Sequence, residues 1–430
     1  MKIAIDAFTL GFAQGTGLAT YARELSYALT QVGHNVYPIY GLTGVSKNPA
    51  LQWPSFIQSL YTRGEPHSLD LKSWLPTGLT YAFNALSGFS CSAQKINAEN
   101  AYAAMPLKQR LPKFDVIFNC RGIYRAAQAY ASFIKKPLFL ELKGNRPDIF
   151  HVTMPLPISM KRVPKVVTVH DLIPLMLPHS TTVNLKRYLN ILHSALRDAD
   201  IIFSVSEHTK NDLVYTLRIP EEKILVTYQS TNTAKAAEKI SEAETKEFLN
   251  EHYSLEYKKY FLFYGAIEPK KNVFRILEAF TKSKTDLPLV IAGKNGWLYY
   301  DVARFLRQRE KDNKIRRLEY LPFNFLLHLL KGARGLIFPS LYEGFGLPVL
   351  EAMQVGCPVI TSHMTSLPEV GGDAVHYVDP LSVSDITAAI DKFDADEAYL
   401  ESLAQKGYAQ AAKFSPEQHM LRVKEGYDRL

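Results

Sequence analysis

The stretch S-L-Y-E-G-F-G-L-P-V-L-E-A-M, from Ser340 to Met353, contains a transition from a strand to a helix. The apolar run Gly335–Pro339 before it has the composition of a buried strand. Pro348 suits the first turn of a helix, where a missing N–H leaves no hydrogen bond unmade. Gly356 suits the end of that helix. A buried strand that leads directly into a helix is the building unit of doubly wound α/β sheets.

Two carboxylates flank this turn, Glu343 in the loop and Glu351 one turn into the helix. The free N–H groups and the positive dipole end of the helix would lie at residues 346–349, which favours a bound phosphate. Carboxylates accept hydrogen bonds from hydroxyl groups. A sugar nucleotide has hydroxyls at both ends and a diphosphate between them, so the pattern suits such a ligand. Taken alone, the pattern suits equally a capped helix with two solvated acids.

Short β-branched runs alternate with helical patterns along nearly the whole chain. The runs expected to form strands are Lys2–Ala7, Val36–Tyr40, Val116–Cys120, Val166–His170, Ile201–Val205, Ile224–Tyr228, Phe261–Gly265, Leu289–Ala292, Leu318–Leu321, Gly335–Pro339, Pro358–Thr361 and Val375–Val378. Helices between strands predict parallel sheets covered on both faces, the doubly wound α/β class. Ligands of such sheets bind beyond the carboxyl ends of the strands, so two facing domains predict a cleft between them.

The chain has 430 residues, and a single core stops growing at about 250–300 residues. The polar stretch Ser230–Tyr257 separates two series of strands. We therefore expect two Rossmann-like domains, at 1–230 and 231–415. Residues 44–112 fit the strand and helix rhythm poorly and are expected to be an insertion that carries some helix.

The composition is that of a globular protein, with 47% hydrophobic and 21% charged residues. The sequence contains no run of about 18 uncharged apolar residues, so no membrane-spanning helix is predicted. The apolar run of the N-terminal M-K-I-A-I-D-A ends at Asp6 after only three apolar positions, which is too short for the apolar region of a signal peptide and suits a buried strand. The three cysteines, Cys91, Cys120 and Cys357, are scattered and in no metal-binding spacing, which indicates reduced thiols and a cytoplasmic location.

The net charge of +8 is unevenly spread. Residues 108–165 alone carry 12 Lys and Arg against 3 Asp and Glu. Such a surplus attracts phosphates, whether of an anionic membrane surface, a lipid diphosphate or a nucleic acid. A solvated basic face without a partner is the other interpretation.

The segment 340–362, S-L-Y-E-G-F-G-L-P-V-L-E-A-M-Q-V-G-C-P-V-I-T-S, resembles the signature of the family 4 retaining glycosyltransferases of the GT-B fold, including its glutamate spacing. Further blocks that resemble the family, in the family's order, are G-T-G-L-A-T-Y-A-R-E-L (15–25), V-V-T-V-H-D-L-I-P-L (166–175), V-S-E-H-T-K-N-D-L (205–213), F-L-F-Y-G-A-I-E-P-K-K-N (261–272), P-L-V-I-A-G-K-N-G-W (288–297) and S-L-P-E-V-G-G-D-A-V-H-Y-V-D-P (366–380). The resemblance covers most of the chain apart from 44–112. It implies an acceptor domain at 1–230, a nucleotide-sugar donor domain at 231–415 and a helix at 416–430 that crosses back to the first domain.

This resemblance implies a role for each matching residue of the donor domain. Glu343 would lie at the hexose near the reacting carbon, and Glu351 would bind the ribose hydroxyls. Lys271 would neutralise the diphosphate, where a cation is most effective because the leaving group gains charge in the transition state. The other residues expected to bind the donor are Gly15, Gly17, Lys270, Phe345, Gly346 and Leu347.

In the first half, the resemblance implies that His170 contacts the donor sugar and takes part in catalysis. The residues expected to line the acceptor side are His151, Asp171, Ser206 and Lys210.

The family usually has an arginine directly after the glycine of the 261–272 block, where this chain has Ala266. Whether Lys270 supplies the second charge is left open by the sequence. Asp198-Ala199-Asp200 precedes a strand and is expected to cap a helix, so we expect no aspartate pair that bridges a metal to the diphosphate. The resemblance implies no cofactor, no metal and no obligate protein nucleophile, with retention by front-face attack.

The set of segments that resemble the family is most similar to the bacterial mannosyltransferases that synthesise surface polysaccharides, including lipopolysaccharide. It implies transfer of a hexose, with GDP-mannose as the first donor to test, to a glycan or lipid-linked glycan acceptor. The segment 108–165 would hold the enzyme peripherally on the inner face of the cytoplasmic membrane.

Alternative functions remain open at this stage. The first alternative is a glycosyltransferase that uses a UDP- or dTDP-sugar. A GT-B sugar-nucleotide epimerase would lack the glutamate pair at this spacing, and a phosphorylase would need a pyridoxal-binding lysine and a far longer chain. A non-catalytic module that binds nucleic acid would leave Glu343, Glu351 and His170 unexplained, so we expect no nucleic acid partner.

Overall fold

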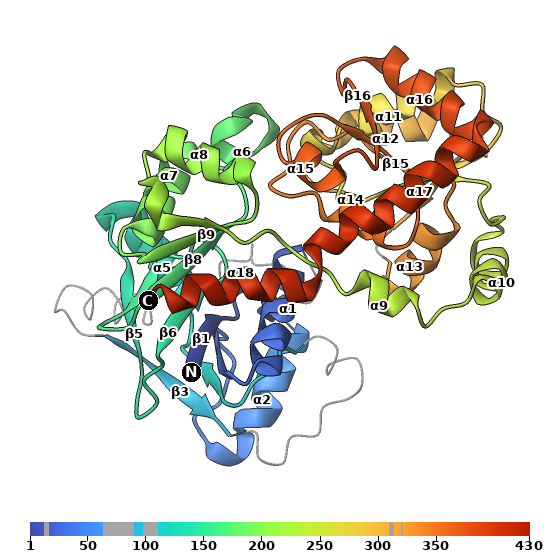
Figure 1. The fold of residues 1–430 in the computed structure, drawn as a ribbon. Helices are drawn as coiled ribbons and strands as arrows, with labels where there is room; N and C mark the ends of the chain where they lie inside the picture. The colour runs from blue at the N-terminus through green and yellow to red at the C-terminus, as the bar shows by residue number, and fades with distance from the viewer. Residues whose placement is uncertain (13–16, 63–89, 98–110, 309–313, 320) are drawn as a thin grey trace.

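The computed structural model describes residues 1–12, 17–62, 90–97, 111–308, 314–319 and 321–430 and arranges them around two β-sheets (Figure 1). Within these residues the first sheet contains ten strands in the order β10-β9-β8-β6-β1-β2-β4-β3-β5-β7. Their bounds are β1 Lys2–Asp6, β2 Asn35–Tyr40, β3 Cys91–Ile96, β4 Ile117–Asn119, β5 Leu138–Leu142, β6 Ile149–Val152, β7 Ile158–Met160, β8 Lys165–Val169, β9 Ile201–Ser204 and β10 Ile224–Val226. Paired strands of this sheet are parallel, except for the antiparallel pair β3 and β4.

The second sheet contains six strands of the described residues, all parallel, in the order β13-β12-β11-β14-β15-β16. Their bounds are β11 Phe261–Tyr264, β12 Leu289–Ala292, β13 Ile315–Leu318, β14 Gly335–Phe338, β15 Val359–Ser362 and β16 His376–Val378. The chain moves outward from β11 on one side and then from β14 on the other. The topological switch point, where ligands of open α/β sheets bind, therefore lies between β11 and β14.

Helices cover both sheets. Their bounds are α1 Gly17–Gln31, α2 Pro49–Thr62, α5 Ile123–Ile134, α6 Ile173–Met176, α7 Leu185–Leu196, α8 Glu207–Leu217, α9 Thr233–Ala237, α10 Glu242–Tyr253, α11 Val273–Lys282, α12 Tyr300–Gln308, α13 Phe323–Gly332, α14 Leu347–Gln354, α15 Leu367–Gly371, α16 Val383–Ala395, α17 Glu397–Ala411 and α18 Pro416–Asp428. In α11, Val273, Ile276, Leu277 and Phe280 recur at helical spacing and are buried, which is the pattern of a helix packed on a sheet.

The last helix returns to the first sheet. Met420, Val423 and Tyr427 of α18 share a buried cluster with Ile3 of β1 and Leu25 of α1, and Figure 1 shows α18 lying across the first sheet. We call residues 1–226 with α18 the first lobe, and residues 233–414 the second lobe. No helix among the described residues is long and apolar enough to cross a bilayer.

The doubly wound α/β class expected from the sequence is confirmed. The strand expected at Leu318–Leu321 is wrong in position, because β13 spans Ile315–Leu318. This is an edge strand that carries two arginines, Arg316 and Arg317, so its apolar pattern is weak. Strands β3, β5, β6 and β7 were not expected. Residues 44–112, expected to be an insertion, include α2 and β3, and residues 63–89 and 98–110 lie outside the described residues.

Candidate active site

The loop after β11 meets the loop after β14 at the switch point of the second sheet. The N–H of Leu341 donates to the carbonyl oxygen of Lys270 at 2.7 Å. Asn272 has a left-handed backbone with φ of 61°, and its side-chain amide donates to the carbonyl oxygens of Pro339 (3.1 Å) and Pro380 (2.6 Å). This fixes the turn that carries both lysines. Asn272 was not among the expected site residues, although asparagine is one of the few residues that adopt this backbone readily.

Lys271 and Glu343 form a buried ion pair at this point, with 2.5 Å between Nζ and Oε1. Their side chains are 12% and 9% exposed, and the ammonium lies 4.6 Å from the ring centroid of Phe338. Burial alone would raise the pKa of Glu343, but Lys271 and Lys270 hold that pKa below its usual value. Burial lowers the pKa of Lys271, and Glu343 opposes that shift. Each charge is therefore compensated mainly by the other.

Lys270 lies beside this pair as a second cation, with its Nζ 3.9 Å from Oε2 of Glu268. Burial would lower the pKa of Lys270, but the carboxylates of Glu343, Asp171 and Glu268 raise it above its usual value. Asp171 follows β8 of the first lobe and is thus brought close to the site. Its Oδ1 also accepts the backbone N–H of Ile173 at 3.1 Å.

Glu351 lies one turn into α14, and its Oε2 accepts a hydrogen bond from the hydroxyl of Tyr264. Tyr264 ends β11, the strand that precedes the lysine turn. Burial raises the pKa of Glu351 to about 7. The site thus contains one carboxyl group, Glu343, whose ionised form is stabilised, and a second, Glu351, that titrates near neutral pH.

The start of α14 provides backbone N–H groups at the same loop. Gly346 precedes the helix with φ of 111°, a conformation that favours glycine. A Cβ built on Gly17, the first residue of α1, would lie 3.7 Å from Cδ1 of Leu347, so the starts of α1 and α14 lie close together. Phe345 is buried, with 3% of its surface exposed. Gly15 lies outside the described residues.

His170 follows β8, and both of its ring nitrogens have partners. Nε2 lies 2.9 Å from the carbonyl oxygen of Thr153, which can only accept, so this nitrogen carries the proton. Nδ1 then accepts from the side-chain amide of Gln229 at 2.7 Å. Burial lowers the pKa of His170 and favours the neutral ring. Its backbone carbonyl oxygen lies so close to Gly344 that a Cβ there would approach to 1.8 Å, so His170 borders the Glu343 loop.

Two of the residues expected on the acceptor side have other surroundings. His151 in β6 is completely buried and is hydrogen-bonded to the hydroxyls of Tyr427 (2.6 Å) and Thr168 (2.7 Å). Burial lowers its pKa to about 3. Lys210 pairs with Glu221 of its own lobe at 2.7 Å. The structure therefore places His151 in the core and Lys210 in a surface ion pair.

Ser206 caps α8, and its Oγ accepts the N–H of Thr209 at 3.0 Å. The same hydroxyl donates to the carbonyl oxygen of Gly344 at 2.7 Å. The side chain of Ser206 thus contacts the backbone of the loop that carries Glu343.

The two acids before β9 have a structural role. Asp198 pairs with the ammonium of Lys165 at 2.7 Å, and Asp200 accepts the backbone N–H of Lys165 at 2.8 Å. Among the described residues, no group of three or more His, Cys, Asp or Glu side chains is placed to hold a metal ion.

Comparisons with known proteins give a consistent assignment. The model of "Glycosyl transferases group 1" matches residues 244–410, and that of "Glycosyltransferase Family 4" matches residues 99–235. The chain is 34% identical over 267 residues to O-antigen chain mannosyltransferase B of Escherichia coli, covering 60% of this chain and 68% of that protein. It is 32% identical over 278 residues to serotype-specific mannosyltransferase WbdA of Escherichia coli, covering 61% of this chain but only 33% of WbdA.

The fold is also found among solved structures. Anabaena HepE, solved in complex with UDP-glucose, matches with a TM-score of 0.67 at 12% identity, and the match covers 100% of both chains. At this identity the match shows a shared fold.

Proposed function

Because the chain belongs to the group 1, family 4 glycosyltransferases, retaining enzymes of the GT-B fold, we propose that it transfers mannose from GDP-mannose to a glycan or lipid-linked glycan acceptor in bacterial surface polysaccharide synthesis. The observation that carries the proposal is the buried Lys271–Glu343 pair at the switch point of the second sheet. Mannose is favoured because O-antigen chain mannosyltransferase B is a relative at 34% identity.

The donor would lie along the switch point with its two ends at the two glutamates. The ribose hydroxyls would bind Glu351, and the hexose would lie at Glu343. The diphosphate would lie between them, at Lys271, Lys270 and the N–H groups at the start of α14. Such preorganised positive charge stabilises the phosphate oxygens most when the bond to the sugar breaks, and removing one such group typically costs about 10²–10³-fold in kcat.

The pair also explains how the site can be charged before the donor binds. An isolated ammonium in this position would carry a desolvation cost of several kcal/mol. Glu343 offsets this cost in the free protein. When the diphosphate arrives, Lys271 can move its hydrogen bond from Glu343 to a phosphate oxygen, which leaves the Glu343 carboxylate to accept from a hexose hydroxyl.

Retention would proceed by front-face attack, in which the acceptor hydroxyl loses its proton to the departing phosphate. His170 would not act as the base in this scheme, because Nε2 carries the proton and Nδ1 is already bonded to Gln229. It would instead shape the donor-sugar side of the site with a neutral ring.

We propose further that the acceptor is met at an anionic membrane surface. Three apolar side chains of the basic segment are exposed: Phe133 by 84%, Ile134 by 46% and Phe139 by 37%. The ammonium of Lys161 lies 5.8 Å from the ring centroid of Phe139. Exposed rings among cations are typical of surfaces that enter the headgroup region of a bilayer.

A vesicle assay tests this surface. Alanine at Lys135, Lys136, Lys161 and Arg162 should release the protein from phosphatidylglycerol vesicles, since each cation near such a surface contributes about 1 kcal/mol. Four exposed lysines of the second lobe serve as the matched control: Lys246, Lys282, Lys284 and Lys392. Equal loss of binding in both variants, or no loss in either, would contradict the proposal.

The donor is tested by a thermal-shift panel of GDP, UDP, dTDP and ADP, followed by transfer assays with the matching sugar nucleotides. A ligand at 100 times its Kd stabilises the folded chain by about 2.7 kcal/mol. We expect GDP to give the largest shift and GDP-mannose to support transfer. A larger shift with UDP or dTDP, with transfer from those sugars, would overturn the mannose assignment in favour of the alternative donors.

A further inference from the structure

The start of α8 in the first lobe is covered by a carboxylate of the second lobe. The N–H groups of Glu207 and His208 donate to the two carboxylate oxygens of Glu369, each at 2.8 Å. Glu369 lies on α15, after β15 of the second sheet. The first N–H groups of a helix have no acceptor within it and carry its positive dipole end. The two lobes are therefore joined by charge-assisted hydrogen bonds.

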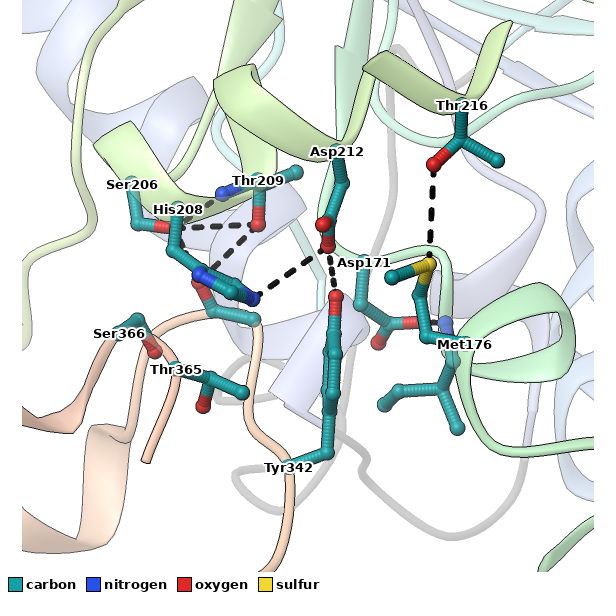
Figure 2. Close-up of polar contacts among 12 residues, drawn as sticks. Asp171, Met176, Ser206, His208, Thr209, Asp212, Thr216, Tyr342, Thr365 and Ser366 are labelled. Carbon is teal, nitrogen blue, oxygen red and sulfur yellow. Dashed lines mark hydrogen bonds and ion pairs between the residues drawn. The ribbon is translucent and has the colours of Figure 1, made fainter. Parts of the chain in front are cut away.

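A second contact joins the same helix to the residue before Glu343. The hydroxyl of Tyr342 donates to Oδ2 of Asp212, and the ring of His208 lies edge-on to that of Tyr342 with 5.4 Å between centroids. Figure 2 shows Tyr342 reaching from the second-lobe loop to Asp212 on α8. Asp212 is 6% exposed, so this bond is largely shielded from water.

A third contact holds the peptide between Gly344 and Phe345. The carbonyl oxygen of Gly344 accepts from the hydroxyls of Ser206 (2.7 Å) and Thr209 (3.3 Å) at the start of α8. On its other side, the Gly344 backbone packs against His170 so closely that no Cβ would fit. The first lobe therefore holds this peptide on one side.

The second lobe holds the same loop from behind. The N–H of Glu343 donates to the hydroxyl of Thr365 at 3.0 Å. The hydroxyl of Ser366 donates to the carbonyl oxygens of Glu343 (2.9 Å) and Phe345 (2.8 Å). The backbone of Glu343 thus has anchors of its own lobe and, through its neighbours Tyr342 and Gly344, anchors from α8.

We propose that the start of α8 positions Glu343 for transfer and that Glu369 is the positioning residue that brings the two together. The inference deepens the proposed function and rests on it. Groups expected to bind the nucleotide, such as Glu351 and Lys271, lie in the second lobe and do not need this contact. The position of the Glu343 backbone relative to the first lobe does need it, because the flanking residues Tyr342 and Gly344 bond to α8, and misplacing a reacting group by about 1 Å costs on the order of 10²-fold in rate.

The kinetic test is Glu369→Gln, which keeps the side-chain shape but removes the charge that two helix N–H groups share. We expect kcat to fall by about 10²-fold while the Kd for GDP stays unchanged. Asp373→Asn is the matched control, because it makes the same charge change close by in the chain, where Asp373 pairs with Lys406 at 3.3 Å within the second lobe. It should leave kcat and Kd unchanged. Equal kcat for Glu369→Gln and Asp373→Asn would overturn the inference.

Amide hydrogen exchange tests the contact without any substrate. In the wild-type protein the N–H groups of Glu207 and His208 should exchange slowly, and in Glu369→Gln they should exchange faster while the core strands keep their protection. Should that variant unfold, Tyr342→Phe gives the same kinetic readout with one hydroxyl removed. Unprotected amides at Glu207 and His208 in the wild type would overturn the inference. Protected amides in a protein that shows no transfer from any sugar nucleotide would count instead against the proposed function.

Discussion

The two lobes present different chemistry to the site. The second lobe gathers charge at its switch point, where Lys271 pairs with Glu343 and Lys270 lies near Glu343, Glu268 and Asp171 of the first lobe. The first lobe contributes His170 with a neutral ring and the capped start of α8. In the proposed function, a bound diphosphate takes the hydrogen bond that Lys271 makes to Glu343 in the free protein. The polar groups of the first lobe keep the hydrogen bonds that they already make. In the proposed function, the second lobe supplies the charged groups that bind the donor, and its Glu369 together with the start of α8 holds the Glu343 loop between the lobes.

The largest expected effect would come from removing the charges of the second lobe. Glu343→Ala should abolish transfer, and Lys271→Ala should lower kcat by about 10²–10³-fold because the departing diphosphate loses a preorganised cation. Initial rates of nucleotide release measure the loss of transfer. Circular dichroism shows whether the variants are folded. Full turnover by Glu343→Ala would contradict the claim that the charged groups of the second lobe are required for transfer.

The next effect is a loss of folding stability when the Lys271–Glu343 ion pair is broken. It can be measured separately from the loss of transfer. Glu343→Gln leaves Lys271 buried without its counterion and should cost about 3–5 kcal/mol in the free energy of unfolding. Adding Lys271→Met should restore most of that loss, while transfer stays absent. Urea unfolding of both single variants and the double variant gives the coupling. Losses that simply add would show that the two side chains do not act as a pair.

A smaller effect should follow the titration of Glu351. Its pKa is raised from 4.5 to about 7 by burial. Ribose hydroxyls bound to the carboxylate favour its ionised form, so affinity for GDP should be full above pH 7 and fall below it, by up to about tenfold per pH unit. The contribution to stability has the opposite direction: it is present below pH 4.5 and is lost as the pH rises through about 7.

Calorimetric titration of GDP across this pH range measures the affinity. Glu351→Gln serves as the reference, because it retains the titration of the nucleotide phosphate but lacks that of the carboxyl group. Identical pH profiles for the variant and the wild type would remove Glu351 from the donor site.

The smallest expected effect is that of EDTA. If Lys270, Lys271 and the start of α14 supply the positive charge, chelation should leave the initial rate essentially unchanged. Complete loss of activity that a divalent cation restores would show that the charge of the second lobe is insufficient for the reaction.

Sequence periodicity was sufficient for the fold where strands are apolar and flanked by helices, as at Gly335–Phe338. It was insufficient for β5, β6 and β7, because three to five residues without intervening helices give too short a pattern. The arginine-bearing edge strand β13 was misplaced for the related reason that only part of its surface is buried. The domain boundary at residue 230 stays a prediction.

The candidate site could be predicted best where the chemical groups lie in short segments that resemble a known family, even when those segments are far apart in the sequence. Glu343 and Lys271 were both selected from the sequence, and the structure joins them in one ion pair. His151 was expected to line the acceptor side, and nothing in its sequence neighbourhood revealed that its ring is buried against Tyr427 from α18. Glu369 was missed because its partners, the N–H groups of α8, leave no trace in side-chain identity.

A crystal structure with the bound donor tests the central claim most directly. The account predicts the diphosphate at Lys271 and the start of α14, with the ribose hydroxyls on Glu351 and the hexose at Glu343. A donor bound away from Lys271 and Glu351 would contradict it.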